Sequence, residues 1–356
     1  MLKRLNLTYA KVGLIALLLT IIVGESWHLL ILSRTKTQSP PSTETTLNLQ
    51  SPPTAQDLND FWKVWSKKMD TLGPQVAYGQ FVSSYSSTPA NYVHELAHII
   101  GQLIYSKMGV DGIAICDKSF AFGCYHTFLA SAIKDHGLEI IPSLNQKCAN
   151  KLQDQALGCT HGLGHGLVAD LGYSDSTLNQ ALGICAGLSG SDPIGGCAGG
   201  VFMEYNLRTL EGPEGQLRTF NSAHPYHPCL NLPSQYRPAC IYWQTQWWGG
   251  VISGSAEEVY NQIGKYCFGL TNNSLQQECF RGAGNAVTQF ANWEVDKTIQ
   301  LCNLMPTKIG KLECRGSAAG LFWTDPLAKA HAKEICHDAD SNIEQSCLKF
   351  SKLDTQ

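Results

Sequence analysis

The segment CTHGLGHGLVADLGYSDSTLNQALGIC, residues 159–185, contains the unit from which the rest of the fold follows. Its first half is rich in glycine and alanine, which predicts an inner helix that a neighbouring helix can approach closely. A polar turn follows, and the stretch STLNQALGIC, residues 176–185, predicts a second helix that ends at the cysteine. The segment therefore predicts one helical hairpin bounded by two cysteines.

The cysteines repeat this unit along the chain. All fourteen fall into seven successive pairs, and the second member of each pair recurs after steps of 33 to 43 residues. A period of this length is typical of a tandem helical-hairpin array. Because no C-x2-C spacing occurs, we expect seven disulfides between the end of one helix and the start of the next, rather than zinc clusters. The pairs are Cys116 with Cys124, Cys148 with Cys159, Cys185 with Cys197, Cys229 with Cys240, Cys267 with Cys279, Cys302 with Cys314 and Cys336 with Cys347.

Two further outer helices have recognisable starts. Ser255 with Glu258 has the spacing of a capping box, and Asp325 followed by Pro326 has the pattern of an N-cap with proline at the first helical position. The sequence therefore predicts outer helices over residues 255–267 and 325–336.

At this point the chain resembles the cysteine-bridged Sel-like repeat proteins, in which paired cysteines also clamp successive αα hairpins. The resemblance covers roughly residues 90–350 and is architectural, because the spacing here is longer and the glycine signature of those repeats is not reproduced. It implies an all-α solenoid and carries over no binding or enzymatic role. Closure of the hairpins into an αα-toroid is an equally good alternative.

The N-terminal region predicts export. Lysine and arginine precede an apolar run, so we expect a cytoplasmic tail at 1–11 and a signal anchor or transmembrane helix at 12–32. Glu25 within this run leaves a signal peptide cleaved near Gly24 as the alternative. A Ser/Thr/Pro-rich stalk over 33–56 would connect it to the cysteine-rich repeat domain, 57–356, on the extracytoplasmic side: periplasm, cell surface or secretory lumen.

Composition limits the partners of this domain. Hydrophobic residues make up 44% of the chain, which is enough to fill a core. Charged residues make up only 15%, the formal net charge is −3, and no basic patch is present in the sequence. We therefore expect a small-molecule or peptide substrate, and a membrane contact through the N-terminal helix, but no nucleic-acid partner.

Five of the eleven histidines share one register. Counted from the second cysteine of each pair, His126 and His161 lie at offset +2 and His165 at offset +6. Extending the register one unit backwards places His94 and His98 of the HELAH motif at the same two offsets, so HELAH is a degenerate first repeat. Histidines four apart lie on one helix face, and these five could surround one metal ion.

The motif HELAH resembles the zincin signature of metallopeptidases. By that resemblance His94 and His98 would bind zinc, and Glu95 would act as the general base on the metal-bound water. Two features depart from a zincin: no further ligand follows at a familiar spacing, and the second pair, HGLGH, lacks the glutamate.

We therefore expect one divalent transition metal, with zinc favoured and copper or iron as alternatives. The leading function is a metal-dependent hydrolase. A copper- or iron-dependent oxidoreductase and a non-catalytic binding or scaffold protein are the alternatives, and in the last case the histidines would only satisfy buried hydrogen bonds.

Later repeats carry other polar groups at the same offsets. Tyr242, Gln246 and Asn285 would line the far side of a central pocket, and Arg281 would hold a substrate carboxylate or phosphate there.

Beside the histidine positions, Tyr125 and Glu204 are candidate outer ligands or partners of the ligands. His224 and His227, in a proline-rich connection, are assigned to a surface loop.

Overall fold

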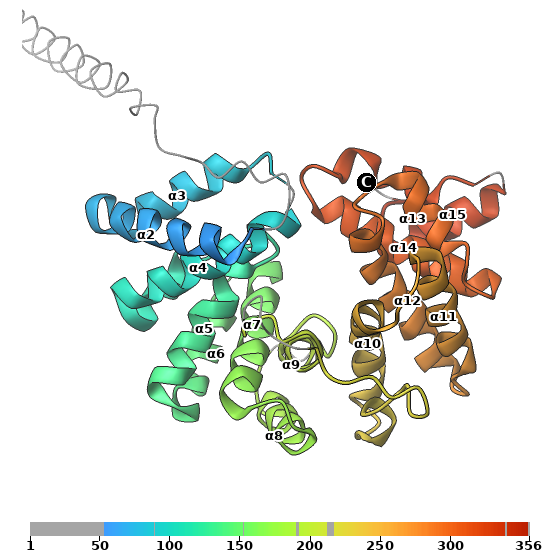
Figure 1. Ribbon diagram of the computed structural model, residues 1–356, viewed down its shortest axis with the longest axis horizontal. Helices are drawn as coiled ribbons and strands as arrows, with labels where there is room; N and C mark the ends of the chain where they lie inside the picture. The colour runs from blue at the N-terminus through green and yellow to red at the C-terminus, as the bar shows by residue number, and fades with distance from the viewer. Residues whose placement is uncertain are drawn as a thin grey trace, which may run out of the picture. The chain divides into compact units, whose positions relative to one another are not determined.

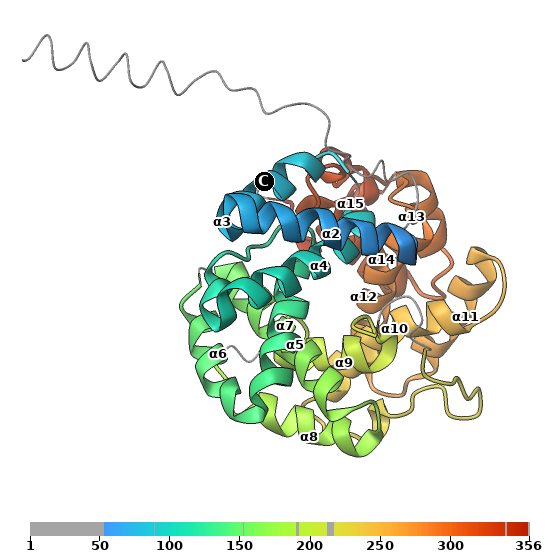
Figure 2. The same cartoon turned by 60° about the vertical axis from the view of Figure 1, so that its left-hand side comes forward.

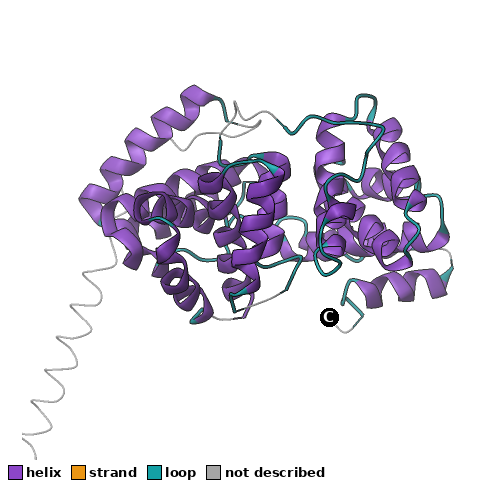
Figure 3. Ribbon diagram, turned by 90° about the horizontal axis from the view of Figure 1, so that it is seen from below, coloured by secondary structure: helices purple, strands orange, loops and turns teal. Residues whose placement is uncertain are grey.

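The chain forms helices wherever its structure is described. The computed structural model describes residues 53–88, 90–151, 153–189, 192–211, 217–338 and 340–354. Every regular element in these ranges is a helix (Figure 3), which confirms the all-α prediction. None of these helices is long and apolar enough to cross a bilayer. The predicted anchor at 12–32 lies outside the described residues.

Two helices precede the repeats. Helix α2, Ala55–Leu72, starts after a capping box formed by Thr54 and Asp57, and α3, Pro74–Tyr85, begins with a proline that suits the first turn. Helix α2 packs on the first inner helix, and its Phe61 is buried in an aromatic cluster with α3. The cysteine pattern does not reach this region and predicts neither helix.

Seven inner helices follow one another, and each packs on the next (Figures 1 and 2). The first contains HELAH and packs on the second as the later ones do, so the register extended backwards from the cysteines describes a true inner helix. The inner helices are α4 (Ala90–Met108), α5 (Gly123–His136), α7 (Gln153–Leu171), α9 (Cys197–Leu207), α10 (Arg237–Val251), α12 (Asn273–Phe290) and α14 (Lys308–Thr324).

Other helical elements connect these inner helices. The predicted capping box of Ser255 and Glu258 is present at the start of α11. The connecting α-helices are α6 (Ile141–Ala149), α8 (Asp175–Ala186), α11 (Ala256–Gly269) and α13 (Val295–Cys302), and α15 (Ser341–Phe350) is the last. The 3-10 helices are η1 (Gly109–Ala114), η2 (Leu138–Ile140), η3 (Cys229–Asn231), η4 (Lys329–His331) and η5 (Glu334–Cys336).

The prediction of an outer α-helix over 325–336 is wrong. The carboxylate of Asp325 does accept hydrogen bonds from the backbone N–H groups of Leu327 and Ala328, but the segment continues as the two short helices η4 and η5. A side-chain cap satisfies the first N–H groups without deciding whether the following turns are α or 3-10. The connection from α9 to α10 also differs from the repeat pattern, because η3 is its only regular element in the described residues.

All seven predicted disulfides are present with the predicted pairing. Their Cα–Cα distances of 5.3 to 5.6 Å lie in the usual range. Each closes a short loop and stabilises the fold by roughly 3 kcal/mol, because the cross-link lowers the conformational entropy of the unfolded chain. Their number indicates an oxidising, extracytoplasmic compartment. The bridges join Cys116 to Cys124, Cys148 to Cys159, Cys185 to Cys197, Cys229 to Cys240, Cys267 to Cys279, Cys302 to Cys314 and Cys336 to Cys347.

Most bridges attach the start of an inner helix to the element before it. Cys124 lies in the first turn of α5, and Cys159, Cys240 and Cys279 lie in the N-terminal halves of α7, α10 and α12. All four of these cysteines are buried. The second cysteine of a pair therefore fixes where each inner helix enters the core, which is why offsets counted from it describe equivalent positions.

The inner helices approach most closely at glycines. A Cβ on Gly164 of α7 would lie 2.0 Å from the carbonyl oxygen of Cys197, and one on Gly200 of α9 would lie 1.9 Å from that of His161. Only glycine fits at these contacts, so the two helices meet backbone to backbone beside the histidines of α7.

Within the described residues α4 and α14 share no extensive interface. Disulfide-clamped helix pairs in a row are consistent with Sel-like repeats, as the sequence suggested.

Candidate metal centre

The first three inner helices bring the five predicted histidines together. Helix α4 supplies His94 and His98, α5 supplies His126, and α7 supplies His161 and His165. Their rings form a continuous cluster in which neighbouring centroids lie 4.2 to 5.8 Å apart. Because side chains four apart share a helix face, the two HxxxH pairs project toward the single histidine on the helix between them.

The five histidines divide into two groups that share a member. His94, His98 and His126 each offer one ring nitrogen within 4.8 Å of the others, and so do His126, His161 and His165. Each group supplies three imidazole nitrogens, the usual number for a metal site that keeps a further position free. The expectation of five nitrogens around a single point is therefore replaced by two three-histidine groups with His126 in common.

His94 and His165 are oriented through one nitrogen and unpartnered at the other. The Nδ1–H of His94 donates to the carbonyl oxygen of Phe120 at 2.9 Å, and Nδ1 of His165 lies 2.9 Å from Oε2 of Glu204. The Nε2 atoms of both rings are buried without a hydrogen-bond partner in the described residues. Histidines that ligate metals have this arrangement, because the bonded nitrogen sets the tautomer and leaves the other lone pair free. The donor set therefore fits a transition-metal cation.

The cluster also favours the neutral imidazole that a metal requires. Burial lowers the pKa values of His94, His98, His126 and His161, and the neighbouring histidines lower them further, although hydrogen bonds to backbone groups partly offset this for His94 and His161. Nε2 of His98 lies 3.2 Å from Nδ1 of His126, so one of these two nitrogens donates to the other. Neutral rings keep their lone pairs at neutral pH, which is the state in which histidine binds a cation.

Glu204 of α9 holds His165 from a fully buried position. Besides His165, its carboxylate accepts hydrogen bonds from the hydroxyls of Thr209 (2.5 Å) and Tyr173 (2.7 Å) and from the backbone N–H of Leu210 (3.0 Å). Burial acts to raise the pKa of Glu204, but the bonds and charge from His165 and the hydroxyls outweigh it and hold the pKa below its usual value. Glu204 is thus an ionised partner of His165 that keeps the ring in place.

Glu95 lies at the edge of the first group. Its Oε2 is 4.0 Å from Nδ1 of His98, and 41% of its side chain is exposed. Burial of the remainder and the charge of Glu204 both raise the pKa of Glu95. The carboxylate of Glu95 therefore lies next to the first histidine group.

The remaining predicted residues lie elsewhere. Tyr125 is buried, and its hydroxyl donates to the carbonyl oxygen of Cys116 at 2.6 Å, so it braces the first disulfide loop instead of facing the histidines. The ring of Trp243 lies 5.5 Å from the ring of His161, and its indole N–H donates to the carbonyl oxygen of Ile194.

A second polar cluster occupies α10 and α12. Gln246 donates to the amide oxygen of Asn285, whose nitrogen donates to the hydroxyl of Tyr242. Arg281 pairs with Glu278 of its own helix at 2.7 Å. The predicted pocket residues Tyr242, Gln246 and Asn285 are therefore joined to one another, and Arg281 is in neither histidine group.

The sequence pattern missed the groups that orient the histidines. The carbonyl of Phe120, the hydroxyl of Tyr173 and the hydroxyl of Thr209 come from loops, where no repeat offset points to them. Comparisons with protein-family models, with curated proteins and with solved structures found no match.

Proposed function

We propose that this protein is an extracytoplasmic metal-dependent hydrolase whose metal, with zinc favoured, is held by the histidine cluster of α4, α5 and α7. The observation that carries the proposal is the pair of buried, unpartnered Nε2 atoms on His94 and His165, each on a ring already oriented through Nδ1. Leaving buried polar atoms without partners costs free energy, and a cation bound at the group to which each histidine belongs would remove that cost.

The group of His94, His98 and His126 is the proposed reactive one. Glu95 stands beside His98 and 41% of its side chain is exposed, so in this proposal a substrate would meet both the metal and a base there. A divalent cation held by three imidazoles lowers the pKa of a bound water and polarises a carbonyl, which is the chemistry of hydrolysis. Glu95 would take the proton from the attacking water.

The group of His126, His161 and His165 is the proposed supporting one. It is buried, and Glu204 with its four donors fixes the orientation of His165. In this proposal its rings hold a cation whose surroundings change little, or they hold His126 in place for the first group. The substrate is a small molecule or a peptide, and the predicted anchor at 12–32 would keep the enzyme at a membrane.

Elemental analysis of the full chain tests the site. The protein is purified from an oxidising compartment, exposed to zinc and freed of loose metal. We expect stoichiometric metal in the native protein and its loss in a His94→Ala/His98→Ala double variant, which removes two of the three ligands of the proposed reactive group. The matched control is His331→Ala/His337→Ala, which removes two exposed histidines outside the cluster and should keep the metal. A native protein that holds no zinc, copper or iron would refute the metal centre and leave a binding scaffold.

Glu95→Gln then tests the chemistry. The amide keeps the size of the side chain but cannot accept the proton, so hydrolysis of chromogenic esters and of an unstructured peptide should fall by about 100-fold or more while the metal content stays unchanged. Equal hydrolysis by native protein and variant would remove Glu95 from the mechanism.

A specific observation favours one other activity. Both histidine groups consist of imidazoles alone, a set that suits copper and iron as well as zinc. An oxidoreductase would take up copper or iron in preference to zinc and would show a visible or paramagnetic signal that the cluster variants lose.

A further inference from the structure

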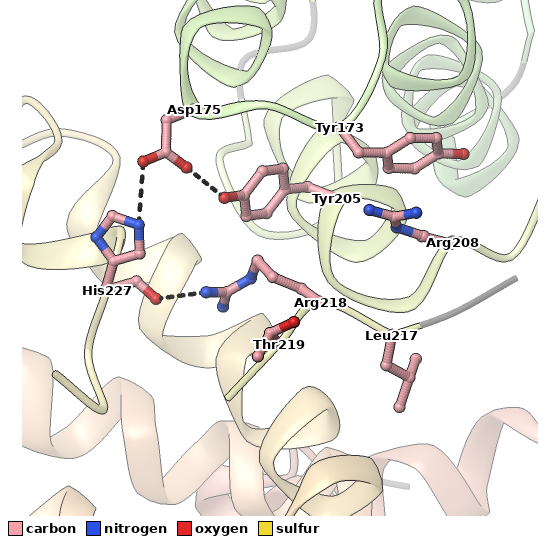
Figure 4. Close-up of a pocket in the computed structure, with 8 residues that line it drawn as sticks. All are labelled: Tyr173, Asp175, Tyr205, Arg208, Leu217, Arg218, Thr219 and His227. Atoms are coloured by element: carbon pink, nitrogen blue, oxygen red, sulfur yellow. Dashed lines mark hydrogen bonds and ion pairs between the residues drawn. The ribbon is translucent and has the colours of Figure 1, made fainter. Parts of the chain in front are cut away.

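A pocket of about 380 Å³ lies outside the histidine cluster (Figure 4). Its wall comes from the end of α9, from the turn before α8 and from the segment 217–227. Besides Thr219, its polar groups come from two arginines, two tyrosines, one aspartate and one histidine: Arg208, Arg218, Tyr173, Tyr205, Asp175 and His227.

Arg218 is a largely buried cation with only neutral acceptors. Its Nη1 donates to the carbonyl oxygen of His227 at 3.0 Å, and its Nη2 donates to the side-chain oxygens of Asn206 (3.1 Å) and Gln244 (3.3 Å). Its Nε is buried without a partner, and the guanidinium lies 3.7 Å over the ring of Trp247. No carboxylate of the described residues forms an ion pair with it, so its direct partners are dipoles and a π face, and the charge of Asp175 acts on it only at longer range.

Arg208 faces the same pocket with a second spare donor. It ends α9 in the left-handed conformation, and its guanidinium lies 4.6 Å over the ring of Tyr173. Its contact with Glu211 is long, at 3.4 Å, and its Nε is buried without a partner. Nη2 of Arg208 has no hydrogen-bond partner among the described residues, so this guanidinium keeps N–H groups for an incoming molecule, and Arg218 adds a second positive charge to the same pocket.

The aspartate of the pocket is already occupied. Oδ1 of Asp175 accepts the hydroxyl of Tyr205 at 2.5 Å, and Oδ2 lies 3.0 Å from Nε2 of His227 (Figure 4). Its direct contacts are therefore with these two groups, and it forms no ion pair with either arginine, although its charge still acts on Arg218.

We infer that this pocket binds an organic oxoanion, a carboxylate or a phosphate group, between the guanidinium groups of Arg208 and Arg218. Guanidinium forks match the paired oxygens of both anions, and charged hydrogen bonds in a partly buried site are strong. The rings of Tyr173 and Tyr205 supply apolar surface for the carbon skeleton that carries the anion.

The pocket shares a wall with the histidine cluster. Tyr173 lines the pocket and donates to one oxygen of Glu204, whose other oxygen holds His165. An anion that settles against Tyr173 would therefore touch a side chain only one hydrogen bond from the partner of His165. The anion site itself requires no metal and does not rest on the proposed hydrolase activity.

Calorimetric titration of the full, metal-free chain tests this inference. Inorganic phosphate and succinate are titrated at constant ionic strength, and we expect saturable binding of at least one; the preferred anion identifies the class of ligand. Arg208→Asn removes the charge with a residue that tolerates the left-handed conformation, and Arg218→Lys keeps the charge but loses the fork. Each should weaken binding by about tenfold or more.

Two further variants complete the test. Asp175→Asn removes the negative charge of the pocket while keeping an acceptor for Tyr205, and it should strengthen binding several-fold. Arg237→Asn removes a charge at the start of α10, outside the pocket, and should leave binding unchanged. Circular dichroism confirms that each variant is folded. The inference is overturned if the native chain binds neither anion, or if Arg208→Asn and Arg218→Lys bind as tightly as the native chain.

Discussion

Replacing Gly164 by alanine should destabilise the fold and disturb the histidine cluster together. Gly164 lies on α7 between His161 and His165 and faces α9. The added Cβ would stand 2.0 Å from the carbonyl oxygen of Cys197 and 2.6 Å from the backbone nitrogen of Val201. Both atoms belong to the backbone, so no side-chain rotation relieves the clash, and α7 must move away from α9.

The size of the effect follows from two opposing terms. Ordinary contact begins near 3.4 Å, so the two helices must separate by more than 1 Å at this point. Overpacking of this kind costs about 3 kcal/mol at the upper end of its usual range, whereas alanine returns about 1 kcal/mol through its better helix propensity. We therefore expect the free energy of unfolding to fall by about 2 kcal/mol.

Gly183→Ala is the matched control. A Cβ on Gly183 of α8 would meet nothing within 4 Å, so only the helix propensity changes and the variant should gain roughly 0.5 to 1 kcal/mol. Urea denaturation of the oxidised proteins, followed by circular dichroism, measures both variants. A lower free energy of unfolding for Gly164→Ala and a higher one for Gly183→Ala would support the backbone contact of α7 with α9.

The same variant should bind metal less tightly. Separation of α7 from α9 draws Glu204 away from Nδ1 of His165, and loss of such an outer partner lowers metal affinity by about 10-fold or more. Competition with a chromogenic chelator measures this loss. Gly164→Ala as stable and as metal-competent as Gly183→Ala would refute the reasoning.

Three other predictions follow from single contacts. Glu204→Gln should lower metal affinity by about 10- to 100-fold, measured by chelator competition, because a neutral amide orients His165 less firmly. Burial raises the pKa of Glu313 to about 7, so the native fold loses stability as the pH rises from about 4.5 to about 7. In thermal melts the stability of Glu313→Gln should equal that of the native chain at pH 4 and exceed it by about 1 to 2 kcal/mol at pH 8. An equal difference in stability at the two pH values would contradict this. The double variant Cys302→Ser/Cys314→Ser should lose roughly 3 kcal/mol of stability and keep its metal, because that disulfide joins α13 to α14 and not the helices that carry the histidines. Loss of the metal would contradict the independence of the metal centre from this disulfide.

The cysteine spacing by itself determined the architecture of this protein. A disulfide that closes a loop of about ten residues leaves little choice of partner, so successive cysteines predicted all seven bridges. The helix period likewise placed His94, His98, His126, His161 and His165 on inner faces, because side chains four apart share a face whatever surrounds them.

Other features depended on contacts between distant segments. The division of the histidines into two groups depends on how α4, α5 and α7 pack, and the free nitrogen of each ring depends on groups such as Phe120 and Glu204. The local sequence also did not predict that residues 325–336 contain two short 3-10 helices instead of one α-helix.

The pocket shows most clearly what only tertiary structure could decide. Arg208 ends α9, Arg218 belongs to the segment 217–227 and Tyr173 lies just before α8, so no period relates them. Short-range patterns repeat because each hairpin buries the same face against its neighbours. Loops follow no such repetition, and their side chains meet only after long-range packing has brought the chain ends of different helices together. The repeat was therefore readable in the sequence, whereas the chemistry that loops add to it was decided by the folded chain.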